Sequence, residues 1–267
     1  MFDRIREKLF EIQEREGVFI FYACESGSRA WGFPSVNSDC DVRFLYARER
    51  DFYLAIDVED KRDVVEVPIS DELDISGWDL RKALRLLRKS NPPLLEWLSS
   101  PIVYLQDDEM VARFRSLVPI SYSPTACMYH YLHMARGNYR EYLKGDEVAV
   151  KKYFYVLRPL LAIKWIEERS EVVPMEFGVM VDALLPDSNL RAEILNLIER
   201  KKQGDELKRE PKIAVISEFI ENEIQRLQTL SIPRRDEKPL MKTLNDTFRE
   251  MIEKSSTHIP HLNSAHN

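Results

Sequence analysis

A Gly-Ser pair followed by two closely spaced aspartates, with an apolar run on each side, most limits what this chain can fold into. The stretch ESGSRAWGFPSVNSDCDVRF covers residues 25–44, with Gly27-Ser28 near its start and Asp39-x-Asp41 near its end. Glycine permits a tight turn. Side chains at positions i and i+2 of a strand share a face, so the two carboxylates repel each other unless a cation lies between them. The pattern predicts a cation site, with a solvated acidic pair as the alternative.

The first hundred residues alternate between short apolar runs and turns, which is typical of an α/β unit. Runs rich in β-branched and aromatic residues predict strands. We expect strands over residues 18–24, 40–47, 63–70, 72–79 (ending at Gly77) and 102–105. An amphipathic helix over residues 1–13 precedes them, and Asp79 is expected to cap a helix over residues 79–90.

Strand patterns end at Asp107, and the remainder has helical periodicity. Long helices are expected over residues 125–143 and 150–168, two or three more follow to about residue 254, and 201–212 is expected to be an exposed connection. The sequence therefore predicts an α+β protein in three parts. These are an α/β domain with a mixed sheet (1–106), a helical domain (107–254) and a flexible tail (255–267).

Composition narrows the class of protein. The 267 residues are 44% hydrophobic and carry a formal net charge of −6, which argues against a general nucleic-acid coat. No apolar run is long enough to cross a bilayer. The three cysteines lack metal-ligand spacing and fit a reducing cytoplasm, so we expect a cytoplasmic protein without a membrane partner.

The motif has a coherent chemical interpretation. Backbone N–H groups at Gly27 and the hydroxyl of Ser28 can approach an anionic triphosphate. Asp39 and Asp41 can hold Mg²⁺, or Mn²⁺ in its place, because hard cations take carboxylate and phosphate oxygens. A third carboxylate on a neighbouring strand would complete a metal site and help to deprotonate an attacking hydroxyl. Asp74 is the choice for this role and Glu66 is the alternative.

Three longer runs resemble one known family. The runs SGSRAWGFPSVNSDCDVRFLY, LDISGWDLRKALRLLRKSNPPLLEWLSSPIVY and KKYFYVLRPLLAIKW are similar to the RNA-repair-pathway DNA polymerase β family of predicted nucleotidyltransferases. The resemblance is strongest over residues 19–104 and weaker over 125–166. It implies a polymerase-β-like nucleotidyltransferase domain followed by a helical domain. The carboxylates at Asp39, Asp41 and Asp74 would then be both catalytic and metal-binding.

The resemblance also suggests residues that bind the nucleotide. In related two-domain enzymes the helical part closes the nucleotide cleft, which makes Lys152, Tyr155 and Arg158 candidates for binding phosphate or base. Helix packing is the alternative for these three. Arg29 follows the Gly-Ser pair and could reach a phosphate or form a salt bridge. Trp31 and Trp78 are expected in the core rather than against a base, and Cys40 on the buried face of its strand.

The predicted function is Mg²⁺-dependent transfer of an NMP from an NTP to an acceptor. The acceptor could be RNA, a protein or a small molecule, and the sequence leaves it and the oligomeric state open. The alternative is a non-catalytic nucleotide-binding regulator or antitoxin-like module, which would need fewer carboxylates. A glycosyltransferase with a metal-binding Asp-x-Asp shares the metal chemistry, but that class gives no reason for Gly27-Ser28 at this spacing.

Overall fold

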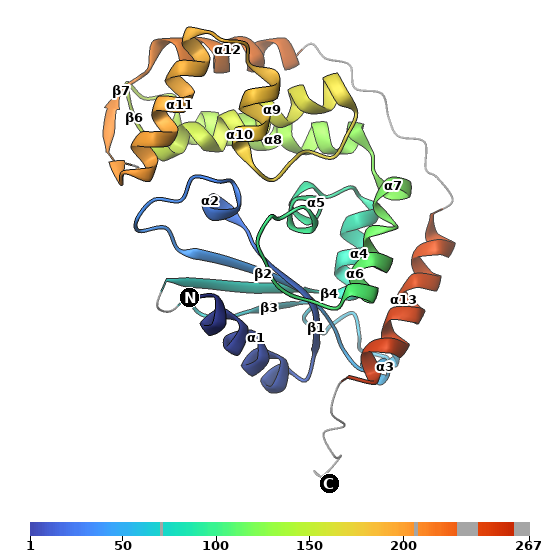
Figure 1. Cartoon of the computed structure of the whole chain (residues 1–267). Coiled ribbons are helices and arrows are strands. Elements are labelled where there is room, and N and C mark those ends of the chain that lie inside the picture. Colours follow the sequence, from blue (N-terminus) through green and yellow to red (C-terminus); the bar gives the residue numbers. More distant parts are fainter. Residues whose placement is uncertain (70–71, 206–207, 229–239, 259–267) are drawn as a thin grey trace.

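The computed structural model describes residues 1–69, 72–205, 208–228 and 240–258. Its elements form a mixed sheet with helices on both faces and a separate group of helices beside it (Figure 1). The strands of the main sheet are β1 (Phe19–Glu25), β2 (Cys40–Ala47), β3 (Val64–Glu66), β4 (Leu73–Asp79) and β5 (Val103–Gln106). The helices around this sheet are α1 (Phe2–Glu16), α2 (Gly27–Ala30), α3 (Arg50–Leu54), α4 (Leu80–Arg88), α5 (Pro92–Leu98), α6 (Asp108–Arg115), α7 (Val118–Ser121) and α13 (Met241–Ser256).

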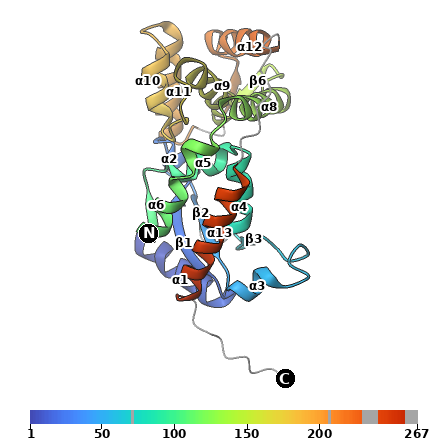
Figure 2. The same ribbon diagram turned by 90° about the vertical axis from the view of Figure 1, so that its right-hand side faces the viewer.

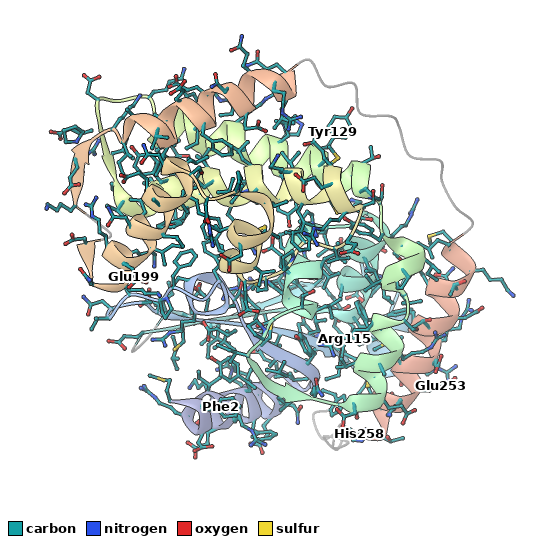
Figure 3. All side chains as sticks on the ribbon, turned by 45° about the horizontal axis from the view of Figure 1, so that its top comes forward. Phe2, Arg115, Tyr129, Glu199, Glu253 and His258 are labelled. Atoms are coloured by element: carbon teal, nitrogen blue, oxygen red, sulfur yellow. The ribbon has the colours of Figure 1, made fainter. Side chains whose placement is uncertain are left out.

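The second group, called here the helical half, lies on one side of the sheet half and is plainest in the turned view (Figure 2). Its helices are α8 (Pro124–Tyr142), α9 (Val150–Arg169), α10 (Phe177–Leu184), α11 (Asn189–Lys202) and α12 (Ala214–Gln228). A short antiparallel pair, β6 (Glu147–Ala149) and β7 (Arg209–Pro211), closes its far end. Tyr129 and Glu199 mark this half in Figure 3, and Phe2 and His258 mark the sheet half.

The main sheet has the strand order β3-β4-β2-β1-β5. β2 and β4 are parallel, and the other neighbouring strands are antiparallel, so the sheet is mixed as predicted. In the parallel pair Asp41 lies directly opposite Asp74. Residues that oppose each other in a ladder point to the same face. The topology therefore brings together two of the three predicted carboxylates.

The two faces of the sheet are buried in different ways. One face packs against α1 through Ile5, Leu9 and Ile12, all fully buried, and this small core includes Val42 and Cys40. The other face joins a larger core that continues through α4, α5 and α6 into the helical half. Burial of Cys40 confirms the expectation that it lies on the buried face of its strand. Its neighbour Asp41 therefore points to the opposite face, toward the helical half.

Several element boundaries differ from the expectations. β4 continues past Gly77 to Asp79, because its pairing with β2 continues to Tyr46. Gly77 does not end the strand but makes room for the Phe44 ring, which a Cβ would approach to 2.2 Å. β3 has three residues instead of the eight expected over 63–70. β6 and β7 were not predicted. The connection expected over 201–212 includes β7 and begins with Lys201, which is in α11 and only 5% exposed.

The proposed division at residue 106 coincides with the end of β5, but later segments return to the sheet half. α6 packs on β1, and α13 packs on α3, α4, α6 and β2 (Figure 2). In the expected tail, α13 continues to Ser256, and the His258 ring stacks on Phe19 at 4.6 Å. Residues 259–267 lie outside the described part of the chain. None of the helices in the described ranges combines the length and apolarity needed to span a bilayer.

Asp79 is the N-cap of α4, as predicted. Its Oδ1 accepts a hydrogen bond from the Arg81 backbone N–H at 2.7 Å, and its Oδ2 accepts one from the Tyr53 hydroxyl at 2.8 Å. Burial raises the pKa of this carboxyl, and the same two hydrogen bonds partly oppose that shift. A polar group this well connected and this buried serves stability.

We expect Asp79→Ala to lower the free energy of unfolding by about 2–3 kcal/mol, because it removes the cap and leaves the buried Tyr53 hydroxyl without an acceptor. The matched control is Asn91→Ala in α5, which removes only a cap to the Leu94 N–H and should cost about 1 kcal/mol. Urea unfolding of both variants measures the difference. Equal losses would contradict a role for Asp79 beyond capping.

Candidate active site

The turn between β1 and β2 brings Gly27 against the side chain of Asp41. Gly27 begins α2 with φ +58°, in the left-handed region that favours glycine. A Cβ on this residue would lie 2.0 Å from Asp41 Oδ2. The glycine is therefore required for its backbone angle and for the space that the Asp41 carboxylate occupies. The Ser26 N–H donates to the Asp41 carbonyl at 2.8 Å, which fixes the turn to the start of β2.

The buried carboxylate of Glu25 anchors the backbone at the start of β2. Glu25, at the end of β1, is fully buried, and its Oε1 accepts the Asp41 N–H at 2.7 Å. Its other oxygen accepts a short hydrogen bond from the Tyr104 hydroxyl of β5. Burial raises the pKa of Glu25, although both hydrogen bonds lower it. Glu25 thus positions the backbone of Asp41, and nothing in the motif itself indicated this role.

Arg43 lies between the two opposed carboxylates. Its Nη2 is 2.7 Å from Asp74 Oδ2 and 3.3 Å from Asp41 Oδ1, and its Nη1 donates to the Asp74 carbonyl at 2.8 Å. Burial raises the pKa of Asp41, Arg43 lowers it, and the nearby Asp74 and Asp39 raise it. The like charges that the sequence placed together are therefore partly balanced by a guanidinium from the same strand.

Of the two candidates for the third carboxylate, Asp74 is the one that shares an ion-pair partner, Arg43, with Asp41. It lies in register with Asp41, with 34% of its side chain exposed. Glu66 lies in the edge strand β3 opposite Ser76, with 66% of its side chain exposed and an ion pair to Arg62. The structure thus places Asp74 beside Asp41 and Glu66 at the edge of the sheet.

A pocket of about 210 Å³ opens above the Gly-Ser turn, between the two halves of the molecule. We call it the acidic pocket. The sheet half contributes Gly27, Ser28, Trp31, Asn37, Ser38, Asp39 and Asp41, and the helical half contributes Lys151, Phe154, Tyr155 and Lys201. One wall therefore carries two carboxylates, and the facing wall carries two ammonium groups. This distribution suits a ligand that contains both a cation and an anion.

The residues of the Gly-Ser turn have different surroundings. Ser28 lines the acidic pocket, and its hydroxyl donates to Ser38 Oγ at 3.1 Å. Arg29 does not line it: Nη2 donates to the Ser38 carbonyl at 2.9 Å and Nε to the Asp39 carbonyl at 3.2 Å. Arg29 therefore holds the loop before β2 and needs no phosphate to be satisfied. Trp78 stacks on Trp97 at 3.8 Å in the core, as expected.

The three residues predicted on α9 separate in space. Tyr155 lines the acidic pocket. Lys152 instead lies over the rings of Tyr142 and Tyr155, at 3.5 and 4.8 Å, and burial lowers its pKa. Its neighbour Lys151 faces the acidic pocket. Arg158 lies deeper, 4% exposed, where it donates to the Met175 carbonyl at 3.0 Å.

Sequence reasoning missed five residues of the pocket: Asn37 and Ser38 in the loop before β2, and Lys151, Phe154 and Lys201 in the helical half. Lys151 could have been found from helix periodicity, because it is four residues before Tyr155 and shares a face with it. Phe154 precedes Tyr155 and was not considered. Lys201 could not have been found, because it comes from a segment expected to be an exposed connection. Its Nζ donates to the Phe33 carbonyl at 3.2 Å, a contact between distant parts of the chain.

The donor atoms of the acidic pocket fit a hard divalent cation. Asp39 and Asp41 supply carboxylate oxygens, the ligands that Mg²⁺ and Mn²⁺ prefer. Within the described ranges, no cluster of three or more His, Cys, Asp or Glu side chains forms a complete metal site. A cation here would therefore take some of its ligands from a bound phosphate or from water, which is common for Mg²⁺.

The mixed sheet and the glycine turn facing an acidic strand are those of a polymerase-β-like α+β protein. The chain belongs to the RNA repair pathway DNA polymerase beta family, which it matches over residues 1–250. It is 50% identical over 254 residues to the Bacillus subtilis (strain 168) protein named Uncharacterized protein YcgL, covering 95% of this chain and 97% of that protein. It also matches the crystal structure of a nucleotidyltransferase-like protein from Exiguobacterium sibiricum 255-15, with a TM-score of 0.31 and 11% identity, over 94% of this chain and 80% of the other.

The contact between Gly27 and Asp41 can be tested with a matched pair of glycines. Gly27 and Gly32 both have positive φ, but a Cβ at Gly32 would meet nothing within 4 Å. Gly32→Ala should lower the free energy of unfolding by about 1–2 kcal/mol through backbone strain alone. Gly27→Ala should cost more, because it also displaces the Asp41 carboxylate. Urea unfolding measures both, and equal losses would show that the Asp41 side chain simply moves aside.

Proposed function

We propose that this protein is a Mg²⁺-dependent nucleotidyltransferase that moves an NMP from an NTP to an acceptor hydroxyl, with Mn²⁺ able to replace Mg²⁺. The observation that carries the proposal is the acidic pocket, in which Asp39 and Asp41 face Lys151 and Lys201 across the Gly27 turn. Carboxylates recruit the cation, and ammonium groups attract the polyphosphate. A nucleoside triphosphate bound with its metal satisfies both walls together. Membership of the family supports the same reaction class.

Each residue has a defined part in the reaction. The backbone at Gly27, the Ser28 hydroxyl and the two lysines hold the triphosphate. Asp39 and Asp41 hold the metal, which supplies charge stabilisation at the reacting phosphate. The acceptor oxygen bonds to the α-phosphorus, the bond from that phosphorus to the bridging oxygen breaks, and pyrophosphate leaves. Asp74 takes the proton from the acceptor hydroxyl. Arg43 holds the Asp74 carboxylate beside the carboxylate of Asp41.

The acceptor class is best found by direct assay. The purified protein is incubated with each α-labelled NTP and Mg²⁺, together with RNAs that differ at their ends and with cytoplasmic protein extract. Transfer of label to RNA or to protein identifies the acceptor, and pyrophosphate release without either points to a small molecule. Binding without any turnover would favour the non-catalytic nucleotide-binding alternative.

The metal ligands are tested by Asp39→Asn and Asp41→Asn. Each should reduce Mg²⁺-dependent turnover at least about 100-fold, because an amide is a poor ligand for a hard cation. Thermal melting should be unchanged or slightly raised, since one of several repelling charges is lost. Glu66→Gln is the matched control, an acidic residue on a neighbouring strand that should keep full turnover. Retained turnover in either aspartate variant would contradict the metal assignment.

The role of Asp74 is tested separately from nucleotide binding. Asp74→Asn removes the base but keeps an oxygen that can accept from Arg43, so the fold should persist. Transfer should fall about 10²–10⁴-fold, the range for general base catalysis. NTP affinity, measured by calorimetry with Mg²⁺, should change little, because Asp74 does not line the acidic pocket. An active Asp74→Asn together with an inactive Glu66→Gln would reverse the assignment.

A further inference from the structure

A second cavity adjoins the acidic pocket and is lined by an arginine with unpaired donors. It has a volume of about 110 Å³ and lies among α5, α8 and α9. Trp31, Phe154 and Tyr155 line both cavities, so they form a shared wall. Beyond this wall lie the side chains of Glu96 and Arg158. We call this second cavity the inner pocket.

Arg158 has more donors than the protein satisfies. Its Nη2 donates to the Met175 carbonyl and lies 3.4 Å from Glu96 Oε2. Its Nε and Nη1 are buried and find no hydrogen-bond partner among the described residues, and neither does Nε1 of Trp31. Leaving such buried donors unpaired is costly. Arg158 and Trp31, which line the inner pocket, therefore carry donors that lack an acceptor among the described residues.

The remaining walls suit a flat ring. The Arg158 guanidinium lies 4.9 Å from the Trp31 ring centroid, and Phe154 and Tyr155 add two more aromatic side chains. Aromatic walls accept planar heterocycles by stacking. Glu96, fixed by the Tyr131 hydroxyl at 2.7 Å, provides carboxylate oxygens that can accept from a ring N–H. Donor, acceptor and aromatic walls together match the edge and faces of a nucleobase.

The spacing along α9 fits this assignment. Lys151 faces the acidic pocket, Phe154 and Tyr155 form the shared wall, and Arg158 lines the inner pocket. These positions are i, i+3, i+4 and i+7, one face of a helix. Seven residues rise about 10 Å, so the two ends of one ligand would lie along a single rigid element.

We infer that the inner pocket binds the base of the NTP and selects bases with a ring carbonyl. This rests on the proposed function, in which the acidic pocket holds the triphosphate. Guanine, uracil and cytosine offer a carbonyl oxygen to the Arg158 donors, whereas adenine has only ring nitrogens and presents an amino donor there. The two functional halves of one nucleotide would then lie in the two adjoining pockets, against the three side chains that line both.

The test measures binding of four α,β-methylene NTP analogues to the full chain by calorimetry with Mg²⁺. The guanine, uracil and cytosine analogues should bind at least about tenfold more tightly than the adenine analogue, the effect of one charge-assisted hydrogen bond. Equal affinities, or a preference for adenine, would overturn the base assignment and leave the proposed function standing. Failure of all four to bind would overturn both.

Arg158→Lys identifies the residue responsible, because it keeps a positive charge but loses the planar fork of donors. It should weaken the three carbonyl-containing analogues about tenfold and leave the adenine analogue unchanged. Inorganic triphosphate, which has no base, should bind the variant as it binds the wild type. If Arg158→Lys weakens triphosphate as much as the guanine analogue, Arg158 is a phosphate ligand and the inference is wrong. Should the variant fail to fold, the wild-type preference decides.

Discussion

The packing of Phe33 into the helical half fixes the geometry on which the rest of the site depends. Its ring lies 4.6 Å from Phe154 of α9 and 5.6 Å from Phe177 of α10, and all three rings are buried. The Phe177 N–H donates to the Trp31 carbonyl, and Lys201 donates to the Phe33 carbonyl, so backbone and ring are held together. Because this segment follows α2 directly, it carries the glycine turn to the helices that supply the opposite wall. Loss of this contact would separate the two walls of the acidic pocket.

The charges of the site follow the same division. The sheet half contributes carboxylates, and Arg43 balances only part of their charge, since burial still raises the pKa of Asp41. The helical half contributes Lys151 and Lys201. Carboxylates and ammonium groups therefore line one pocket from the two halves of the molecule. A lone anion would meet Asp39 and Asp41, and a lone cation would meet the lysines. A metal-bound polyphosphate matches both walls.

How much could be predicted depended on how local each contact is. The sequence predicted β1, β2 and the turn between them, because Gly27 and Asp39-x-Asp41 lie within one short segment. Parallel pairing of β2 with β4 could not be read from the pattern, so the sequence could not show that Asp74, and not Glu66, lies beside Asp41. On α9, Lys151 lines the acidic pocket, whereas the predicted Lys152 lies one position further along the helix, over the rings of Tyr142 and Tyr155. Lys201 reaches the pocket only through tertiary packing.

The location of Asp74 has a consequence for the direction from which an acceptor would arrive. Asp74 is absent from the lining of the acidic pocket, yet Arg43 joins it to Asp41, which does line it. Under the proposed reaction, the nucleotide would therefore reach Asp41 from the acidic pocket, and the acceptor would reach it from the side of Asp74. The nucleotide lies against the helical half, and the acceptor hydroxyl approaches over β4 and the three-residue edge strand β3. The sheet half would then set which acceptor is used, and the helical half which nucleotide.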